Sequence, residues 1–248
     1  MILDASSFVF QPPPQIMRAR RVLIKPDAAY PSPYPVSNSR ETLAGIVSGI
    51  RKVSDADIIF LESGAGGKAM HDIYRALHYD FPRVLTLDVK NSVCVEVENP
   101  LTHPFAMATF WIPNIILSCD YLITMSCFKV VRGNGHFSIM NLLSLLPENK
   151  YRAEGDDGKG MLQSLGIQKV VADLYFTLPF DLAIIDGRKK LTCQSDPSKG
   201  AEEDLGKVFI GDPYEVDGEA SEVARVGTEY LRLIEAAEAE VEPEHTPG

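Results

Sequence analysis

A charged residue follows directly after each of several apolar runs in this chain of 248 residues. The runs "VLIK", "IIFLE", "LAIID" and "VFIGD" end in Lys25, Glu62, Asp186 and Asp212, and "LITMS" leads into Lys129. If these runs are parallel strands, their carboxyl ends meet at one edge of the sheet, where ligands of open α/β sheets bind. The pattern then predicts two amines and three carboxylates around one crevice. The alternative is that each charge only marks the point where a strand leaves the core.

The segment "GDPYEVD" contains two carboxylates with different expected roles. Asp212 is a natural N-cap, because Pro213 follows it at the first position of a predicted helix. Asp217 lies about one helical turn later, beside apolar residues of the same helix. A carboxylate there would be partly buried and would need a cation, for which Lys25 and Lys129 are the candidates.

These residue types suit two kinds of chemistry. Lys25 and Lys129 would bind an anionic substrate through charge-assisted hydrogen bonds. Glu62, Asp186 and Asp217 would hold a divalent metal or serve as acid and base. His136, in the glycine-rich segment "RGNGHFS" before a predicted helix, is the histidine best placed for acid–base work. Lys129, Asp186 and His136 are therefore the predicted catalytic residues.

The stretch "FLESGAGGKAM" joins a predicted strand to a predicted helix through three glycines. It is not a Walker A loop, since Ala69 stands where that motif has Ser or Thr. Classical dinucleotide binding is also a poor match. A turn with several free backbone N–H groups can still bind an anion. Gly64, Gly66 and Lys68 are accordingly predicted to contact the substrate, and the alternative is a plain tight turn.

Apolar strands alternate with amphipathic helices along the chain, which predicts an α/β fold. The sheet should be mainly parallel with helices on both faces, and an antiparallel strand at an edge is compatible with the pattern. The run "VCVEVEN" alternates apolar and polar residues, so it is expected to be half-exposed or an edge strand. Three regions are predicted: a loosely ordered lead-in over 1–20, one α/β domain over 21–240, and an acidic flexible tail over 241–248.

Composition excludes several classes of protein. The formal net charge of -10 argues against general nucleic-acid binding, which needs a basic surface. No apolar run approaches the roughly 20 residues of a membrane helix, and the first residues do not resemble a signal peptide. The four cysteines form no C-x-x-C pair, so neither an iron–sulfur cluster nor a zinc ribbon is expected. Reduced thiols in a cytoplasmic protein are the simplest interpretation.

The order of motifs resembles the domain of unknown function 362 family. The motifs are "VLIKPD", "LESGAGG", "DYLITMSCFKV", "NLLSLLP", "DLAIIDG" and "FIGDPYEVD", between Val22 and Gly227. The resemblance implies that Asp27, where the family usually has Asn, and Asn141, of a Lys-Asn pair that is Met140-Asn141 here, belong to the substrate site. Many members carry an iron–sulfur portion that this chain lacks, so a redox partner protein would have to supply a cluster.

Three functions follow as hypotheses. The first is an enzyme that acts on a small anionic or carboxylated metabolite, with a divalent metal as a candidate cofactor. The second is a ligand-binding module that keeps the pocket without the chemistry. The third is an accessory subunit that docks on an iron–sulfur redox partner. The substrate, the reaction and the oligomeric state are not determined by the sequence.

Overall fold

A computed structural model describes residues 1–152 and 159–241, with only the backbone described for 239–241. Its centre is an eight-stranded sheet in the order β1-β10-β9-β7-β2-β3-β4, with β8 paired to β7. The strands are β1 (Ile2–Asp4), β2 (Arg21–Lys25), β3 (Asp57–Glu62), β4 (Val84–Asp88), β7 (Tyr121–Val131), β8 (Asn134–His136), β9 (Leu182–Cys193) and β10 (Ala201–Gly211).

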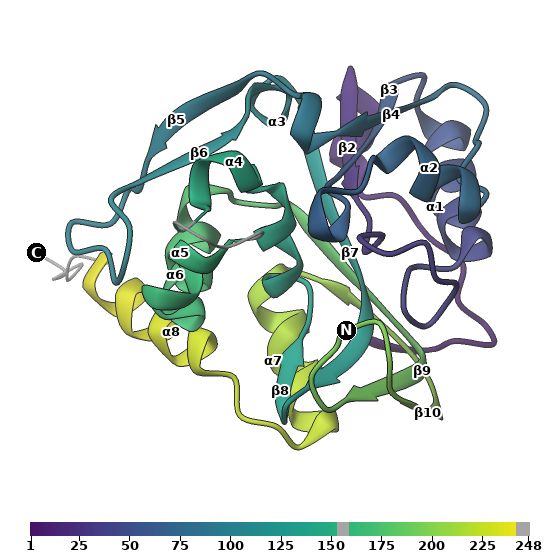
Figure 1. Ribbon diagram of the computed structural model, residues 1–248. Helices are drawn as coiled ribbons and strands as arrows, with labels where there is room; N and C mark the ends of the chain where they lie inside the picture. The colour runs from purple at the N-terminus through teal and green to yellow at the C-terminus, as the bar shows by residue number, and fades with distance from the viewer. Residues whose placement is uncertain (153–158, 242–248) are drawn as a thin grey trace, which may run out of the picture.

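The strands β4, β3, β2, β7 and β9 are parallel to their neighbours, whereas β10, β1 and β8 pair antiparallel. The prediction of a mainly parallel sheet with an antiparallel edge is therefore confirmed. Parallel strands need crossovers, and the helices that make them cover both faces of the sheet. Figure 1 shows the sheet running between the two groups of helices.

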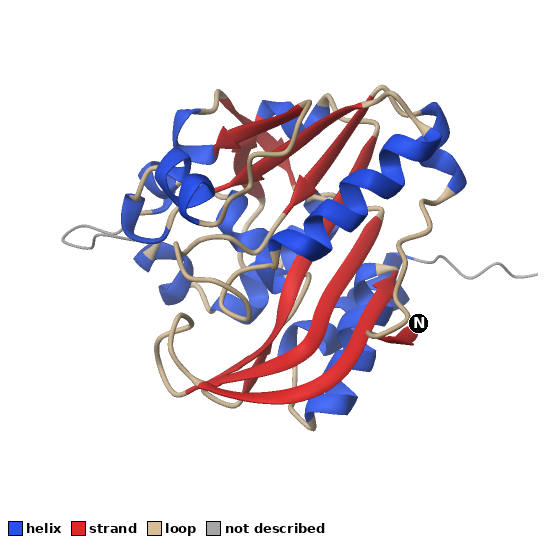
Figure 2. Ribbon diagram, turned by 90° about the vertical axis from the view of Figure 1, so that its right-hand side faces the viewer, coloured by secondary structure: helices blue, strands red, loops and turns tan. Residues whose placement is uncertain are grey.

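One face of the sheet is covered by η1 (Pro14–Arg18), α1 (Arg40–Val53) and α2 (Met70–Ala76), which pack on alternate residues of β2, β3 and β7. Figure 2 views this face, with helices lying across the strands. Helix α1 begins at an N-cap, Ser39, whose side chain accepts from the backbone N–H of Thr42. Leu43, Ile46 and Ile50 repeat at helical spacing and are fully buried against the sheet.

The opposite face carries a second set of elements. Helix α8 packs on α6, and α7 packs on β9 and β10 (Figure 1). This set consists of the hairpin β5 (Cys94–Glu98) and β6 (Thr109–Pro113), α3 (Asn114–Leu117), η4 (Met140–Leu145), α4 (Glu148–Tyr151), α5 (Gly160–Ser164), α6 (Ile167–Thr177), α7 (Pro213–Ala224) and α8 (Glu229–Val241), while the short η2 (Ala65–Gly67) and η3 (Val89–Asn91) follow β3 and β4.

Several local features differ from the sequence analysis. The first residues are ordered by the core, because β1 pairs with β10 and Ile16 is fully buried. The run "VCVEVEN" is half-exposed, as expected, and it pairs with β6 in a separate two-stranded sheet rather than with the main sheet. Most of the predicted tail lies outside the described residues.

The strands β7 and β9 extend beyond the carboxyl ends of the neighbouring parallel strands. Pairing between β7 and β9 passes from Cys127–Asp186 to Phe128–Lys190, so residues 187–189 of β9 bulge out. After the bulge both strands continue to Val131 and Cys193. The chain then turns through Arg132 and Gly133, both with positive φ, into β8. This hairpin places His136 directly opposite Lys129.

Within the described residues, none of the helices has the length and apolar character needed to cross a membrane.

Candidate functional site

Lys25 and Glu62 form an ion pair at the carboxyl ends of the neighbouring strands β2 and β3. Their closest atoms, Nζ and Oε2, are 2.6 Å apart, and both side chains are almost fully buried. Lys25 Nζ also donates to Pro26 O at 2.9 Å and to Asn141 Oδ1 at 2.5 Å. Burial lowers the pKa of Lys25, although Glu62 favours its charged form. Since an ammonium group has three N–H donors, Lys25 has none left for a ligand.

Lys129 and Asp27 form a second ion pair, with Nζ and Oδ2 2.6 Å apart. Burial disfavours the charge on Lys129, but the charge and hydrogen bond of Asp27 together with smaller contributions from Cys127 and Tyr30 outweigh it, so the pKa of Lys129 is raised. Asp27 also accepts from the backbone N–H of Cys127 at 3.3 Å. Among the residues that the structure describes, Lys129 Nζ has no further hydrogen-bond acceptor or ion-pair partner. Lys129 thus keeps donors that Lys25 does not.

A cavity of about 190 Å³ opens beside the Lys129–Asp27 pair. Side chains of both strand ends and of η4 surround it, so the sheet edge and the opposite layer meet there. Its lining consists of Asp27, Ala29, Tyr30, Glu62, Lys129, His136, Phe137, Met140, Asn141, Leu143, Ser144 and Pro197. We call this space the Lys129 cavity. It brings together the predicted site residues Asp27, Glu62, Lys129, His136 and Asn141.

His136 contributes a neutral imidazole to the Lys129 cavity. Burial and the positive charge of Lys129 together lower the pKa of His136 to about 4, against the opposing effect of Asp27. In the β7–β8 pairing His136 is directly opposite Lys129. Residues paired in this way place their side chains on the same face of an antiparallel ladder. The imidazole is therefore neutral near pH 7, and its unprotonated ring nitrogen can accept a hydrogen bond, while burial and the neighbouring cation disfavour its protonation.

The lowered pKa of His136 predicts a dependence of stability on pH. Between pH 6.5 and 4 the unfolded chain binds a proton at His136 that the folded chain does not, so stability falls as the pH falls. We expect the wild type to lose about 2 kcal/mol more unfolding free energy between pH 7.5 and 5 than a His136→Asn variant. Urea unfolding of both proteins at the two pH values measures this difference, and equal losses would contradict the assignment.

Asn141, in η4, supports the site from the opposite layer through its side-chain amide. Its Oδ1 accepts from Lys25, and its Nδ2 donates to Met125 O at 3.1 Å. The amide therefore links β2, β7 and η4. Asn141 also lines the Lys129 cavity, so it holds Lys25 in place at the wall of that cavity.

Asp186 does not join the Lys129 cavity, contrary to the catalytic role expected from its strand end. It is fully buried and forms an ion pair with Arg188, in which Nη2 and Oδ2 are 2.6 Å apart. Its carboxylate also accepts from Thr42 Oγ1 at 2.9 Å, near the start of α1. The bulge at residues 187–189 allows Arg188 to fold back onto Asp186. Asp186 thus fastens α1 to β9.

Among the described residues Asp217 forms no ion pair, and Lys25 and Lys129 pair with Glu62 and Asp27 instead, so the pairing expected for Asp217 is wrong. Its carboxylate accepts four hydrogen bonds, from the N–H and Oγ of Ser138, the N–H of Ile139 and the hydroxyl of Tyr230, at 2.6–2.9 Å. Burial raises the pKa of Asp217 to about 6, while these donors favour the charged form. The N-cap predicted for Asp212 is confirmed, since its side chain accepts from the N–H groups of Tyr214 and Glu215.

The glycine stretch forms a turn that is largely occupied by its own contacts. Helix α2 begins at Met70, whose N–H donates to the Asp88 carboxylate. The N–H groups of Ala65 and Gly67 donate to backbone carbonyls. Gly64 lies so close to the Lys68 carbonyl that a Cβ would come within 2.2 Å of it. Gly64 and Lys68 line a different cavity from Lys129.

The model of a family described as a domain of unknown function, DUF362, matches residues 22–222. This chain belongs to the DUF362 family. The match covers most of the range in which the motif order resembled that family, so the resemblance is confirmed. Among curated proteins, the comparison found no match.

The fold of this DUF362 chain is similar to that of a protein of known structure. The structure of the lactate racemase apoprotein from Thermoanaerobacterium thermosaccharolyticum is similar, with a TM-score of 0.56 and 14% sequence identity. The match covers 88% of the DUF362 chain and 53% of that chain, so the DUF362 chain spans about half its length. At this identity the similarity shows the fold alone.

The predicted metal set of the DUF362 chain does not assemble. Across residues 1–152 and 159–241, no group of three or more His, Cys, Asp or Glu side chains is arranged to hold a metal ion. Glu62, Asp186 and Asp217 each accept hydrogen bonds from a separate set of protein donors. The sequence analysis placed them together because each lies at or near a strand end, but their side chains turn toward different neighbours.

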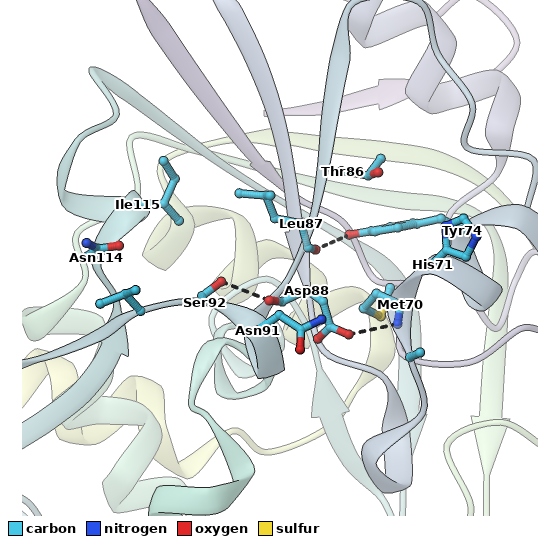
Figure 3. Close-up of a pocket in the computed structure, with 12 residues that line it drawn as sticks. Met70, His71, Tyr74, Thr86, Leu87, Asp88, Asn91, Ser92, Asn114 and Ile115 are labelled. Carbon is cyan, nitrogen blue, oxygen red and sulfur yellow. Dashed lines mark hydrogen bonds between the residues drawn. The ribbon is translucent and has the colours of Figure 1, made fainter.

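A larger cavity of about 400 Å³ in the DUF362 chain lies between α2, β4 and the turn that follows β4. Figure 3 shows that Asp88 and Tyr74 there are bonded to neighbouring backbone groups, Asp88 to the Met70 N–H and Tyr74 to the Leu87 carbonyl. The lining contains no Lys or Arg. This cavity therefore lacks the cation that an anionic substrate would need.

The apolar half of the Lys129 cavity, formed by Phe137, Met140 and Leu143, was not predicted. A fully buried carboxylate, Asp173, was not predicted either. It accepts hydrogen bonds from the N–H groups of Phe105, Ala106 and Met107. A single carboxylate in the apolar run "VVADLYF" was the available signal for Asp173. No signal at sequence level marked the apolar wall.

Proposed function

We propose that this chain is an enzyme that binds a small carboxylated metabolite in the Lys129 cavity. The observation that carries the proposal is the contrast between two buried lysines. Lys25 uses its three donors within the protein, whereas within the described part of the chain Lys129 has one partner, Asp27, and borders a cavity. A carboxylate that receives the remaining donors of Lys129 would form charge-assisted hydrogen bonds in a water-poor site.

The size and the lining of the cavity support a small ligand. Pockets for drug-sized molecules span about 300–1,000 Å³, and the Lys129 cavity has about 190 Å³. Phe137, Met140 and Leu143 offer apolar contact on one side, opposite the charged residues. This combination suits a short aliphatic or hydroxylated acid better than a nucleotide or a peptide.

His136 supports a catalytic role in addition to binding. Its neutral imidazole is opposite Lys129 across the β7–β8 pair, so a carboxylate held by Lys129 would lie near a proton acceptor. The ammonium group would stabilise negative charge that develops on the ligand when a proton leaves. The proposed reaction class is therefore proton transfer to or from the bound acid, with His136 as acid–base and Lys129 as the electrostatic stabiliser.

Ligand binding is tested by thermal shift and calorimetry with a panel of short mono- and dicarboxylic acids. A ligand at one hundred times its dissociation constant stabilises the native state by about 2.7 kcal/mol. For any acid that raises the melting temperature of the wild type, we expect Lys129→Met to lower the affinity about tenfold or more. The double variant Lys129→Met/Asp27→Asn removes both charges of the pair, so it controls for a folding defect caused by an unpaired Asp27.

Turnover separates the proposed enzyme from the other two functions. Exchange of carbon-bound hydrogen with D₂O, followed by NMR on the bound acid, should be lost in His136→Asn while binding persists. Binding by the wild type without exchange or conversion would favour a ligand-binding module. Failure of every acid to bind, with purification of the chain on an iron–sulfur protein, would favour the accessory-subunit hypothesis.

Asp27→Asn should strengthen acid binding, in contrast to Lys129→Met. Asp27 competes with an incoming carboxylate for the same ammonium group, because its Oδ2 is 2.6 Å from Lys129 Nζ. Asparagine keeps the shape and removes the competing charge. We expect about tenfold tighter binding of the acid, equivalent to about 1.4 kcal/mol. Unchanged or weaker affinity in calorimetry would show that Asp27 does not occupy the ligand's place.

A further inference from the structure

A second cavity, of about 270 Å³, lies on the other side of the residues that follow β3. Three cationic side chains from separate segments line it: Lys68 from the glycine turn, Lys90 from η3, and Arg152 after α4. We propose that this cavity binds the phosphate group of a phosphorylated ligand. The proposal concerns a site separate from the Lys129 cavity and does not depend on the function proposed there.

The backbone around this cavity is shaped to bring the cations together. Gly66 and Gly67 both have positive φ, so the turn after β3 folds back on itself without the strain that a side chain would introduce. Lys90 Nζ donates to the Gly67 carbonyl at 3.1 Å, which ties η3 to that turn. The short distance between Gly64 and the Lys68 carbonyl closes the turn from the other side.

The charges in the cavity favour an anion in spite of two carboxylates. Asp88 uses one oxygen for the Met70 N–H and the other for the Lys90 N–H, so its charge is already stabilised by backbone donors. Glu148 is the other acidic residue in the lining. Lys68 and Lys90 form no ion pair with any residue in the described ranges. Three cations gathered in one cavity contrast with a chain of net charge -10.

A phosphate is the anion that best fits this arrangement. It carries up to two charges and three acceptor oxygens, which can be shared among cations that arrive from different directions. The carboxylate proposed for the Lys129 cavity needs only one such cation. The Ser63 hydroxyl lines the second cavity and donates to the Ser144 carbonyl at 2.7 Å, and Ser144 lines the Lys129 cavity. This contact joins the walls of the two cavities.

Calorimetry with inorganic phosphate, pyrophosphate and ADP tests the proposal on the full chain. We expect at least one of the three to bind the wild type, and we expect Lys68→Ala/Lys90→Ala to weaken that binding at least tenfold. Both lysines are exposed, so the variant should fold. Tighter binding of ADP than of pyrophosphate would identify a nucleotide as the ligand, and the reverse order would identify a free or terminal phosphate.

A matched variant distinguishes a site from general attraction to positive charge. Lys52→Ala removes an exposed lysine from the last turn of α1. It should not change phosphate affinity by more than about twofold. The proposal is overturned if no probe binds at millimolar concentration, or if Lys52→Ala weakens binding as much as the double variant does.

Discussion

Replacing Lys25 by methionine should lower the free energy of unfolding by about 3–5 kcal/mol, because it leaves a buried carboxylate without its counter-ion. The carboxylate is that of Glu62, whose side chain is 1% exposed and lies 2.6 Å from the lysine ammonium. Glu62 would keep hydrogen bonds from the N–H groups of Ala28 and Ser63, but these do not neutralise its charge. Asn141 would lose its cationic donor at the same time.

Two further variants make this expectation specific to the buried pair. Lys25→Met/Glu62→Gln removes both charges and should recover a large part of the lost stability, since the uncompensated charge is gone. Lys189→Met breaks the exposed pair with Glu202, whose side chains are 42% and 45% exposed. That variant should unfold at almost the same urea concentration as the wild type. Equal losses for Lys25→Met and Lys189→Met would refute the structural role of Lys25.

Replacing Asp217 by alanine should cost about 3 kcal/mol or more of unfolding free energy. Four donors lose their acceptor together, and two of them are backbone N–H groups that cannot turn toward another partner. The Tyr230 hydroxyl, which bridges α8 to α7 through Asp217, is also left without an acceptor. Each buried donor without a partner costs about 1–3 kcal/mol, but the losses are not additive.

Asp212 provides the control for Asp217 on the same helix. Asp212→Ala removes an exposed N-cap of α7 and should cost about 1 kcal/mol. Asp217→Asn should fall between the two, because the amide nitrogen would face the N–H of Ile139 while the remaining oxygen still accepts from Ser138. Guanidinium unfolding of the three variants gives the order. If Asp217→Ala is no worse than Asp212→Ala, the four-donor arrangement does not hold α7 in place.

The local elements follow from short stretches of sequence. Apolar runs about six residues long alternate with segments of helical spacing, and this pattern led correctly to a mainly parallel sheet covered on both faces. The N-cap at Asp212 depends on residues that are adjacent in the chain, so it was predictable as well. The order of motifs was enough to place the chain in the DUF362 family, which the family model confirms over residues 22–222.

What the sequence alone determined is which charged residues stand at the ends of strands, because strand ends are set by local patterns of burial. Their partners were decided only by the tertiary structure, because a side chain of one strand end can reach several neighbours about 5 Å away across the sheet. Lys25 was satisfied by Glu62 and Asn141, and Asp186 by Arg188 after an unforeseen bulge, while Lys129 pairs with Asp27 and with no other of the described residues. The availability of Lys129 for a ligand is a property of that three-dimensional arrangement.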